Sequence, residues 1–516
     1  MKTLREKLFW IIPLMITLIG LSILYFTNLY RFTEPPSENW SREIQVGTMD
    51  AYLSPIIHSI EDKTEIILVE EGRILRKTYD ANYQLLNEET IPSPMKKWDA
   101  YYIENDNQFF FINNTIINGN TNQIIDEADL FVPASKGKHI FYTKGQTIFE
   151  LTVETGETKE VATTSYPIKF LKNDADYIMA YTKRLESGEL TIFRMKSDKY
   201  EEIHYENIEL GISEQIQNIL FTVHDEKLFI GLHSETQSLQ NKKTFLYVSE
   251  TDLSNPNIVL SRIYPHDPIT NAPLRGIDHF QLRTIDGKLE FLFRGIGFTY
   301  KETNENQAFN IYSMLIEGED IQTERLSNTY HMSGNPFFIG KNSIGWKQLE
   351  SDSKNSIFIA SNNPNVIEKA DKTTLEEYLV AFGMCIGMLS TSIFVLYLLI
   401  MWIIFPIIYL AIIALLQKQS NASIEKPIYF YGGVVVYIAG ALLFKNHLFP
   451  DRGAYVHAPS FLKFDGNDIF FILSFAIIAL LSVKLINREW SSSGKYIYFI
   501  GLQFLLYTMI LGPYYL

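Results

Sequence analysis

Residues 378–417 form a run of 40 amino acids without a charged side chain. A continuous helix of that length would rise about 60 Å at ~1.5 Å per residue, whereas the hydrocarbon core of a bilayer is only ~30 Å thick. The run is therefore predicted to lie in a membrane. We interpret it as one crossing with a kink or break at Pro406, because residues 396–400 contain no turn former and unpaired backbone is costly in lipid. Two crossings stay open as the alternative.

A second uncharged segment, residues 8–30, follows Lys2, Arg5 and Lys7. It is longer than the apolar part of a signal peptide and ends in aromatic residues rather than in a small-residue cleavage site, so we expect an uncleaved anchor. The basic residues before it favour a cytoplasmic amino terminus. We therefore assign residues 1–31 to the cytoplasmic start and the anchor, and residues 32–376 to an extracytoplasmic domain.

Three further apolar segments follow the long run, at residues 428–444, 469–483 and 496–511. If the long run crosses once, the predicted cytoplasmic loops after it contain five Lys or Arg residues and the external loop contains three. The positive-inside rule then favours five spans in all and an external carboxyl terminus. Residues 377–516 are thus predicted to form a carboxyl-terminal domain with about four transmembrane helices, in an integral plasma-membrane protein.

The region between the anchor and the long run has the alternating polar and apolar pattern of antiparallel β-strands. In its clearest unit, the apolar strand 139–142 turns at Lys144-Gly145 into the strand 147–153, and a polar strand begins at Thr158. We find seven such units, about 47 residues apart on average, whose second strands begin at Ile74, Ile116, Ile148, Leu190, Phe245, Phe309 and Ile357.

Units of this size and order resemble the blades of the β-propeller superfamily. The resemblance covers residues 42–365 and implies a seven-bladed ring that residues 43–46 would close by joining the last blade. No Gly-His to Trp-Asp pair repeats, so no particular family is assigned. The predicted fold is an all-β, membrane-anchored ectodomain joined to an α-helical transmembrane domain. Because the unit spacing is uneven, an irregular β-sandwich or two β-domains form the alternative.

The predicted ectodomain is strongly acidic. The chain has a formal charge of −14, and because its two ends are basic, residues 31–377 carry −19. Such a surface repels nucleic acid. Besides the lipid bilayer, we expect a neutral or cationic partner, namely a protein, a peptide or a glycan, at a face of the propeller. The single cysteine, Cys385, lies in the apolar run and excludes a disulfide within the chain.

The sequence contains no recognisable catalytic motif. It lacks the His-Glu-x-x-His, Gly-x-Ser-x-Gly and dinucleotide-binding patterns. The segment 334–341 has five residues between its glycines, and no Ser or Thr follows its lysine, so it is not a phosphate-binding loop. We expect no catalytic residue, no cofactor and no metal.

Two weaker candidate sites remain. His447, Asp451, Arg452 and His457 gather in the loop between the third and fourth predicted spans, where they would form a solvated external cluster. Gly383 and Gly387 form a Gly-x-x-x-Gly pair that would let two membrane helices approach closely.

These observations favour a non-catalytic membrane protein whose propeller serves binding, sensing or scaffolding in a membrane complex. The alternative is a subunit of a transport or export assembly of the permease type, and a third possibility is an enzyme that uses the 445–468 loop.

The predicted orientation is testable on intact cells. Protease added from outside is expected to degrade residues 32–376 and to leave a tag on Met1 protected, because only the former would lie beyond the membrane. Immunoblots against both regions provide the measurement, and permeabilised cells are the control. Survival of the β-rich region in intact cells would contradict this orientation.

Overall fold

The computed structural model describes residues 2–50, 53–60, 62–104, 107–133, 139–174, 176–184, 187–196, 199–208, 210, 214–236, 243–254, 256–299, 301, 309–318, 320–349, 355–420, 427–449, 458–486 and 490–515. The chain divides into two compact units. One contains residues 35–372, and the other combines residues 1–34 with residues 373–516.

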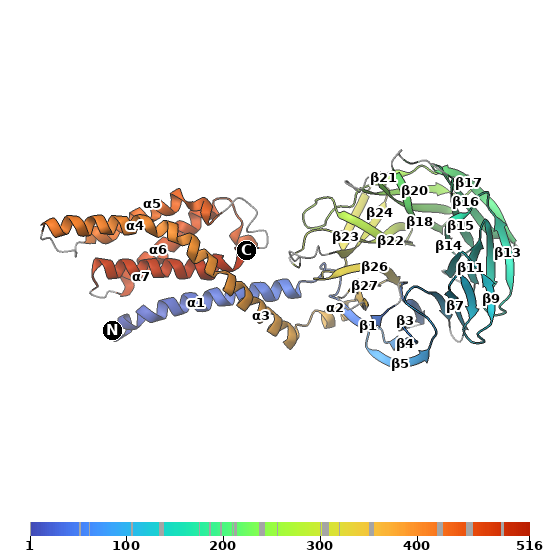
Figure 1. Ribbon diagram of the computed structural model, residues 1–516, viewed down its shortest axis with the longest axis horizontal. Coiled ribbons are helices and arrows are strands. Elements are labelled where there is room, and N and C mark those ends of the chain that lie inside the picture. Colours follow the sequence, from blue (N-terminus) through green and yellow to red (C-terminus); the bar gives the residue numbers. More distant parts are fainter. Residues whose placement is uncertain are drawn as a thin grey trace. The chain divides into compact units, whose positions relative to one another are not determined.

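Within the described residues, unit 35–372 contains seven four-stranded antiparallel sheets arranged as the blades of a propeller (Figure 1). Blades 1 to 4 consist of β2 Ile56–Ile60, β3 Lys63–Glu70, β4 Arg73–Tyr79 and β5 Leu85–Pro92; β6 Ala100–Glu104, β7 Asn107–Ile112, β8 Thr115–Asn118 and β9 Ile124–Glu127; β10 Leu130–Pro133, β11 His139–Lys144, β12 Thr147–Thr152 and β13 Thr158–Thr163; and β14 Ile168–Asp174, β15 Tyr177–Arg184, β16 Ser187–Lys196 and β17 Lys199–Ile208. Blades 5 to 7 consist of β18 Glu214–His224, β19 Lys227–Thr236, β20 Thr244–Asp252 and β21 Ser261–Ile263; β22 Arg275–Ile285, β23 Lys288–Ile296, β24 Asn310–Glu317 and β25 Asp320–Arg325; and β26 Met332–Ile339, β27 Ser343–Leu349, β28 Asn355–Ser361 and β1 Ile44–Met49.

The predicted seven-bladed propeller is confirmed. The strand pairs that the sequence pattern identified are the second and third strands of each blade, which are the most apolar because both of their faces pack against neighbouring blades. The first strand of each blade lies toward the centre, and the fourth lies at the rim (Figure 1). Rim strands such as β5 are largely exposed. They lack a continuous apolar pattern for that reason, and the sequence predicted only two of them, β13 and the closing strand β1.

The ring closes through strand β1, as residues 43–46 predicted. β1 pairs antiparallel with β28, with Ile44 opposite Ile359 and Met49 opposite Asn355. The rim strand of blade 7 therefore comes from the amino-terminal end of the propeller, and its other three strands come from the carboxyl-terminal end. This arrangement leaves the ring without a break between its first and last strands.

The two ends of unit 35–372 are bound to the same part of the propeller. Trp40 is buried against Leu292 and Trp346, and its indole Nε1 donates to Glu324 Oε2 at 3.1 Å. The Arg325 guanidinium donates to the carbonyl of Pro36 at 3.0 Å. Helix α2, Pro364–Ala370, follows the last strand, and Asp371 just after it accepts the Arg42 N–H at 3.2 Å. The entering and leaving segments thus meet at blades 6 and 7.

The second unit is helical, and within the described residues it has four helical segments long and apolar enough to cross a membrane. They lie at Lys7–Thr33, Leu375–Leu415, Asn467–Ile486 and Ser492–Tyr514, and a shorter apolar helix covers Pro427–Leu443. The helices are α1 Lys2–Thr33, α3 Leu375–Thr391, α4 Ile393–Ser420, α5 Pro427–Leu443, α6 Asn467–Ile486 and α7 Ser492–Leu506, with short turns η1 Lys445–His447, η2 Ser460–Leu462, η3 Tyr507–Leu511 and η4 Gly512–Tyr514.

The helix of the long uncharged run is interrupted at Ser392, and the break predicted at Pro406 does not occur. Helix α4 continues through Pro406, whereas α3 ends at Thr391. The hydroxyls of Ser390, Thr391 and Ser392 donate to the carbonyls three residues earlier, at 2.6, 2.8 and 2.6 Å. Such side-chain bonds compete with the helical backbone bonds, which explains why this polar trio interrupts an otherwise apolar helix.

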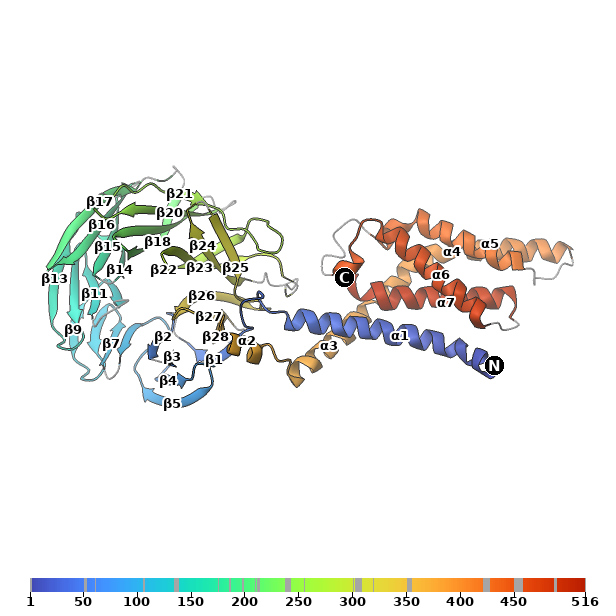
Figure 2. The same cartoon turned by 180° about the vertical axis from the view of Figure 1, so that it is seen from behind.

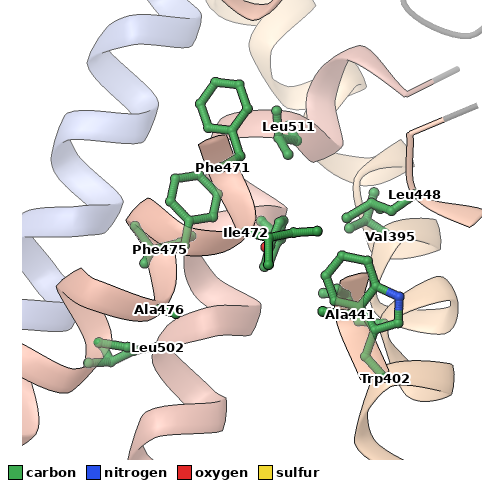
Figure 3. Close-up of a cluster of buried hydrophobic side chains, with 14 of the residues drawn as sticks. Val395, Trp402, Ala441, Leu448, Phe471, Ile472, Phe475, Ala476, Leu502 and Leu511 are labelled. Carbon is green, nitrogen blue, oxygen red and sulfur yellow. The ribbon is translucent and has the colours of Figure 1, made fainter. Parts of the chain in front are cut away.

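The helices of this unit pack around one apolar core (Figure 3). Val395 and Trp402 of α4 face Ala441 of α5, Ile472 and Phe475 of α6 and the end of α7. The Tyr25 hydroxyl of α1 donates to the carbonyl of Tyr378 at the start of α3, at 3.5 Å. The two segments that connect this unit to residues 35–372 are therefore neighbours here as well.

Closure of the propeller depends on the packing of blade 7. Trp346 of β27 is fully buried and stacks on Phe358. Trp346→Ala should lower the free energy of unfolding of the propeller by about 3–5 kcal/mol, because it leaves a cavity in the core. Urea unfolding of the full-length protein in detergent, followed by the β-sheet circular dichroism signal, measures this change. Trp98→Ala is the control, since Trp98 is 73% exposed and its loss should change stability by less than about 0.5 kcal/mol.

Candidate functional site

The rim strands β21 of blade 5 and β25 of blade 6 (Figure 2) line a hollow of about 730 Å³. One wall consists of β21 and the connection that follows it, including Tyr264 and His266. The opposite wall is the first half of β25, with Ile321 and Gln322. This volume lies in the range of ordinary ligand sites, and its lining combines aromatic, apolar and hydrogen-bonding side chains.

A buried aspartate fixes the shape of the first wall. Asp267 is only 2% exposed. Its Oδ1 accepts the N–H groups of Ile269 and Thr270 at 3.0 and 2.8 Å, and its Oδ2 accepts the Phe298 N–H at 2.9 Å. These bonds satisfy the buried carboxylate and hold the connection in a turn. Gly297 is required here, because a Cβ at this position would lie 2.2 Å from Asp267 Oδ2.

Arg262 provides a rigid cationic group at the edge of the hollow. Its guanidinium lies 3.5 Å from the centre of the Phe245 ring and donates to Glu214 Oε1 at 3.1 Å. Glu214 in turn accepts the hydroxyls of Ser234 and Tyr247. The charge of Arg262 is thus balanced, and its flat face is fixed by stacking.

The second wall is the edge of a sheet. β25 pairs with β24 on one side and has no partner strand on the other among the described residues. Edge strands present unpaired N–H and C=O groups that can pair with an added strand. Ile321 is 37% exposed beside this edge, so an extended chain in the hollow would find both backbone and apolar contacts.

The sequence-predicted site residues lie elsewhere. His447 is the last residue of η1, and neither its side chain nor residues Asp451, Arg452 and His457 belong to the described part of the chain, so the proposed cluster stays a prediction. In the described residues, no group of three potential metal ligands occurs. Gly383 and Gly387 lie on α3, where an added Cβ would meet no atom within 4 Å. Helix pairing through these two glycines also stays a prediction.

The sequence did not indicate the hollow. β21 has three residues and β25 has six, mostly exposed, so neither shows the apolar alternation of a core strand. Two large side chains, Tyr264 and Ile321, are exposed beside the hollow, and Ile321 follows the turn at Gly318. They provide a weak local signal.

No protein-family model and no curated protein matches the chain. Among solved structures, it is similar to the β-propeller domain of the Trilobed protease from Pyrococcus furiosus, with 11% identity and a TM-score of 0.30 over 63% of this chain and 98% of that chain. It is also similar to a prolyl endopeptidase, with 10% identity and a TM-score of 0.36 over 67% and 54%. Hsv2p from Kluyveromyces lactis has 9% identity and a TM-score of 0.29 over 56% and 99%.

The shape of the hollow should depend on Asp267. Asp267→Asn replaces one acceptor by a donor that faces the Phe298 N–H, and should lower the free energy of unfolding by about 1–3 kcal/mol. Hydrogen exchange with mass spectrometry should show faster exchange of the amides of Ile269, Thr270 and Phe298. Asp286→Asn, in an exposed turn, is the matched control. Unchanged exchange in Asp267→Asn would show that the turn is held by other contacts.

Proposed function

We propose that this protein is an integral membrane protein whose propeller lies outside the cytoplasm and binds an extended polypeptide segment in the hollow between blades 5 and 6. The supporting observation is a ligand-sized hollow whose wall is the unpaired edge of β25. A binding role of this kind needs no catalytic group, in keeping with the absence of catalytic motifs from the sequence.

The edge of β25 favours a polypeptide over a globular small molecule. Strand addition uses backbone hydrogen bonds for affinity and side-chain pockets for specificity. Ile321, Tyr264 and the hydrophobic stem of Arg262 offer apolar contacts beside the edge. A segment with an apolar or aromatic residue at alternate positions fits these contacts.

The charges around the hollow further restrict the kind of polypeptide that it can bind. Arg262 is paired with Glu214, and the Asp267 carboxylate is satisfied by backbone N–H groups. The exposed carboxylate of Asp320 remains at the rim of the hollow. Residues 31–377 also carry a formal charge of −19, so a neutral or basic segment would be attracted and an acidic one repelled.

The same strand connects the hollow to the segment that leads to the anchor helix. Gln322 and Thr323 line the hollow, and the next residue, Glu324, accepts the Ser37 hydroxyl at 2.8 Å and the Trp40 indole N–H at 3.1 Å. A ligand that orders β25 would therefore also order residues 36–40. We infer that occupancy of the hollow is sensed at residues 36–40, which follow α1 in the chain.

A peptide screen tests this proposal. The full-length protein in detergent is screened against a synthetic library of extended peptides, and binding is measured by fluorescence anisotropy. Ile321→Glu should weaken the best ligand about tenfold or more, because it places a charge in the apolar contact. Methylating the ligand's backbone N–H groups at alternate positions should have a similar effect if a strand is added to the sheet.

Ile124→Glu is the matched control. Ile124 lies on rim strand β9 and is 65% exposed, so the substitution adds the same charge to another blade. Equal weakening by both variants would indicate a general charge effect. The proposed site would be refuted if the library contained no peptide that binds, or if Ile321→Glu bound the best peptide as tightly as the unmodified protein does.

A second candidate function, a subunit of a transport or export assembly, is favoured by irregular backbone in the helical unit. The interruption at Ser392 lies against Gly512, where an added Cβ would be 2.7 Å from Ser392 Cβ, and the preceding residues Tyr507–Leu511 form a π-helix. One turn earlier, Gln503 is fully buried, and its side-chain oxygen and nitrogen have no hydrogen-bond partner among the described residues. Broken helices and buried polar groups mark substrate paths in transporters, an analogy at the level of architecture. Co-purification with an ATP-hydrolysing subunit would favour this function over peptide sensing.

A further inference from the structure

Helices α1 and α7 run side by side in the helical unit (Figure 1), and residues of both line a groove of about 620 Å³. The α1 side consists of Phe9 and Pro13. The α7 side is one face of the helix, because its residues fall at positions i, i+3, i+4, i+7, i+8 and i+11. They are Gly494, Ile497, Tyr498, Gly501, Leu502 and Leu505. Trp490 and Ser491, just before α7, complete the lining.

Two glycines keep the groove open along α7. A Cβ on Gly501 would meet no atom within 4 Å. A Cβ on Gly494 would have only Ser491 and Trp490 as neighbours, at 3.5 Å and beyond. Ile497, on the same face of the helix, is 72% exposed. The side chains of the helical unit therefore leave this space unfilled.

An aromatic cluster lies at one end of the groove. The Phe9 ring is 5.4 Å from the Trp490 ring and 5.2 Å from the Tyr498 ring, and the Trp490 and Tyr498 rings are 5.2 Å apart. The Tyr498 hydroxyl donates to the Phe9 carbonyl at 3.3 Å. Trp and Tyr side chains are enriched at the level of the lipid headgroups. This end of the groove is therefore expected at the membrane surface, and the end at Leu505 in the hydrocarbon region.

The length of the groove matches one lipid chain. Leu505 lies 11 residues after Gly494, which is a rise of about 16 Å at ~1.5 Å per residue. One leaflet provides about half of a hydrocarbon core that is ~30 Å thick. A transmembrane helix of another protein would need contacts along the whole thickness of about 30 Å. A single acyl chain therefore fits the groove better than a helix does.

Basic residues accompany the aromatic end. Lys495 follows Gly494 and lies seven residues before Leu502, so it is on the groove side of α7. In the sequence, residues 1–7 contain Lys2, Arg5 and Lys7 against Glu6, and residues 484–495 contain Lys484, Arg488 and Lys495 against Glu489. The side chains of each segment thus carry a net positive charge. Basic clusters of this kind attract anionic lipid headgroups.

We propose that the groove between α1 and α7 binds one acyl chain of an anionic phospholipid of the cytoplasmic leaflet, with the headgroup beside Lys495. The bound lipid would join the anchor helix to the last long helix, because each contributes one side of the groove. This inference rests on the membrane location in the proposed function, and it is independent of the peptide site on the propeller.

Native mass spectrometry of the full-length protein, released from detergent, tests the proposal with two added lipids. Dioleoyl phosphatidylglycerol and dioleoyl phosphatidylcholine have the same acyl chains and differ in headgroup charge. The phosphatidylglycerol should form a one-lipid complex with an apparent affinity at least about tenfold higher. Equal affinities of the two lipids would overturn the assignment to an anionic lipid.

Gly501→Leu fills the groove without a change of charge. It should lower the affinity for phosphatidylglycerol about tenfold or more. Gly383→Leu is the matched control, because an added Cβ on this α3 residue also meets no atom within 4 Å. It should bind the lipid as the unmodified protein does. Unchanged affinity in Gly501→Leu would refute the site. A change in the number of chains per complex in Gly501→Leu would assign the groove to a contact between copies and would also overturn the proposal.

Lys495→Gln tests the position of the headgroup. It should lower the affinity for phosphatidylglycerol about fivefold and leave that for phosphatidylcholine unchanged, because it removes one headgroup contact. Lys484→Gln is the matched control, since Lys484 belongs to α6, which contributes no residue to the groove. Equal losses in the two variants would indicate a diffuse charge effect and would overturn the headgroup position.

Alkaline carbonate extraction of cell membranes separates this proposal from the one on which it rests. Release of the protein into the soluble fraction would refute the membrane location, and with it the lipid site. Retention of the protein in the membrane, together with equal affinities for the two lipids, would refute the lipid site alone.

Discussion

The backbone hydrogen bonds between β1 and β28 are the interaction on which the propeller depends. Without them, blade 7 would present an unpaired strand on one side and β1 would have no sheet to join. The pairing also determines where the chain enters and leaves the propeller, because its first strand and its last strand must then both lie in blade 7. The contacts of Trp40 with Glu324 and of Arg42 with Asp371 follow from that closure. In the helical unit, the Tyr25 hydroxyl lies next to the Tyr378 carbonyl. The two segments that join the units are therefore neighbours there as well.

The sequence predicted the parts of the fold that are determined by burial. The second and third strands of every blade alternate between two packed faces, and their apolar residues, such as Ile66 to Val69, are almost fully buried. Apart from β13 and β1, the rim strands were not predicted, because one of their faces is in water and any polar residue is tolerated there. β25 and β21, which form the hollow, belong to that class. The hollow itself lies between β21 and β25, which are more than 50 residues apart in the chain, and no local sequence pattern indicates that they lie close together.

The interruption in the long apolar run shows a related limit. The sequence predicted a kink or break at Pro406, because proline lacks an N–H group for the helical hydrogen bond, yet α4 continues through Pro406. The helix is interrupted instead at the serine and threonine residues 390–392, whose hydroxyls donate to nearby carbonyls of their own helix. Whether such a trio interrupts a helix depends on what lies beside it, and here Gly512 leaves room for the interruption at Ser392.

The ring closure also determines when the propeller becomes complete during synthesis. Ile44 and Ile359, which pair in the closing sheet, are separated by more than 300 residues, so β1 leaves the ribosome long before its partner exists. Bacterial or eukaryotic chains grow by about 5–20 residues per second, which leaves this strand unpaired for tens of seconds on the order of magnitude. Contacts so distant in sequence form late and slowly. The newly made chain therefore passes through a period in which an incomplete ring exposes sheet edges.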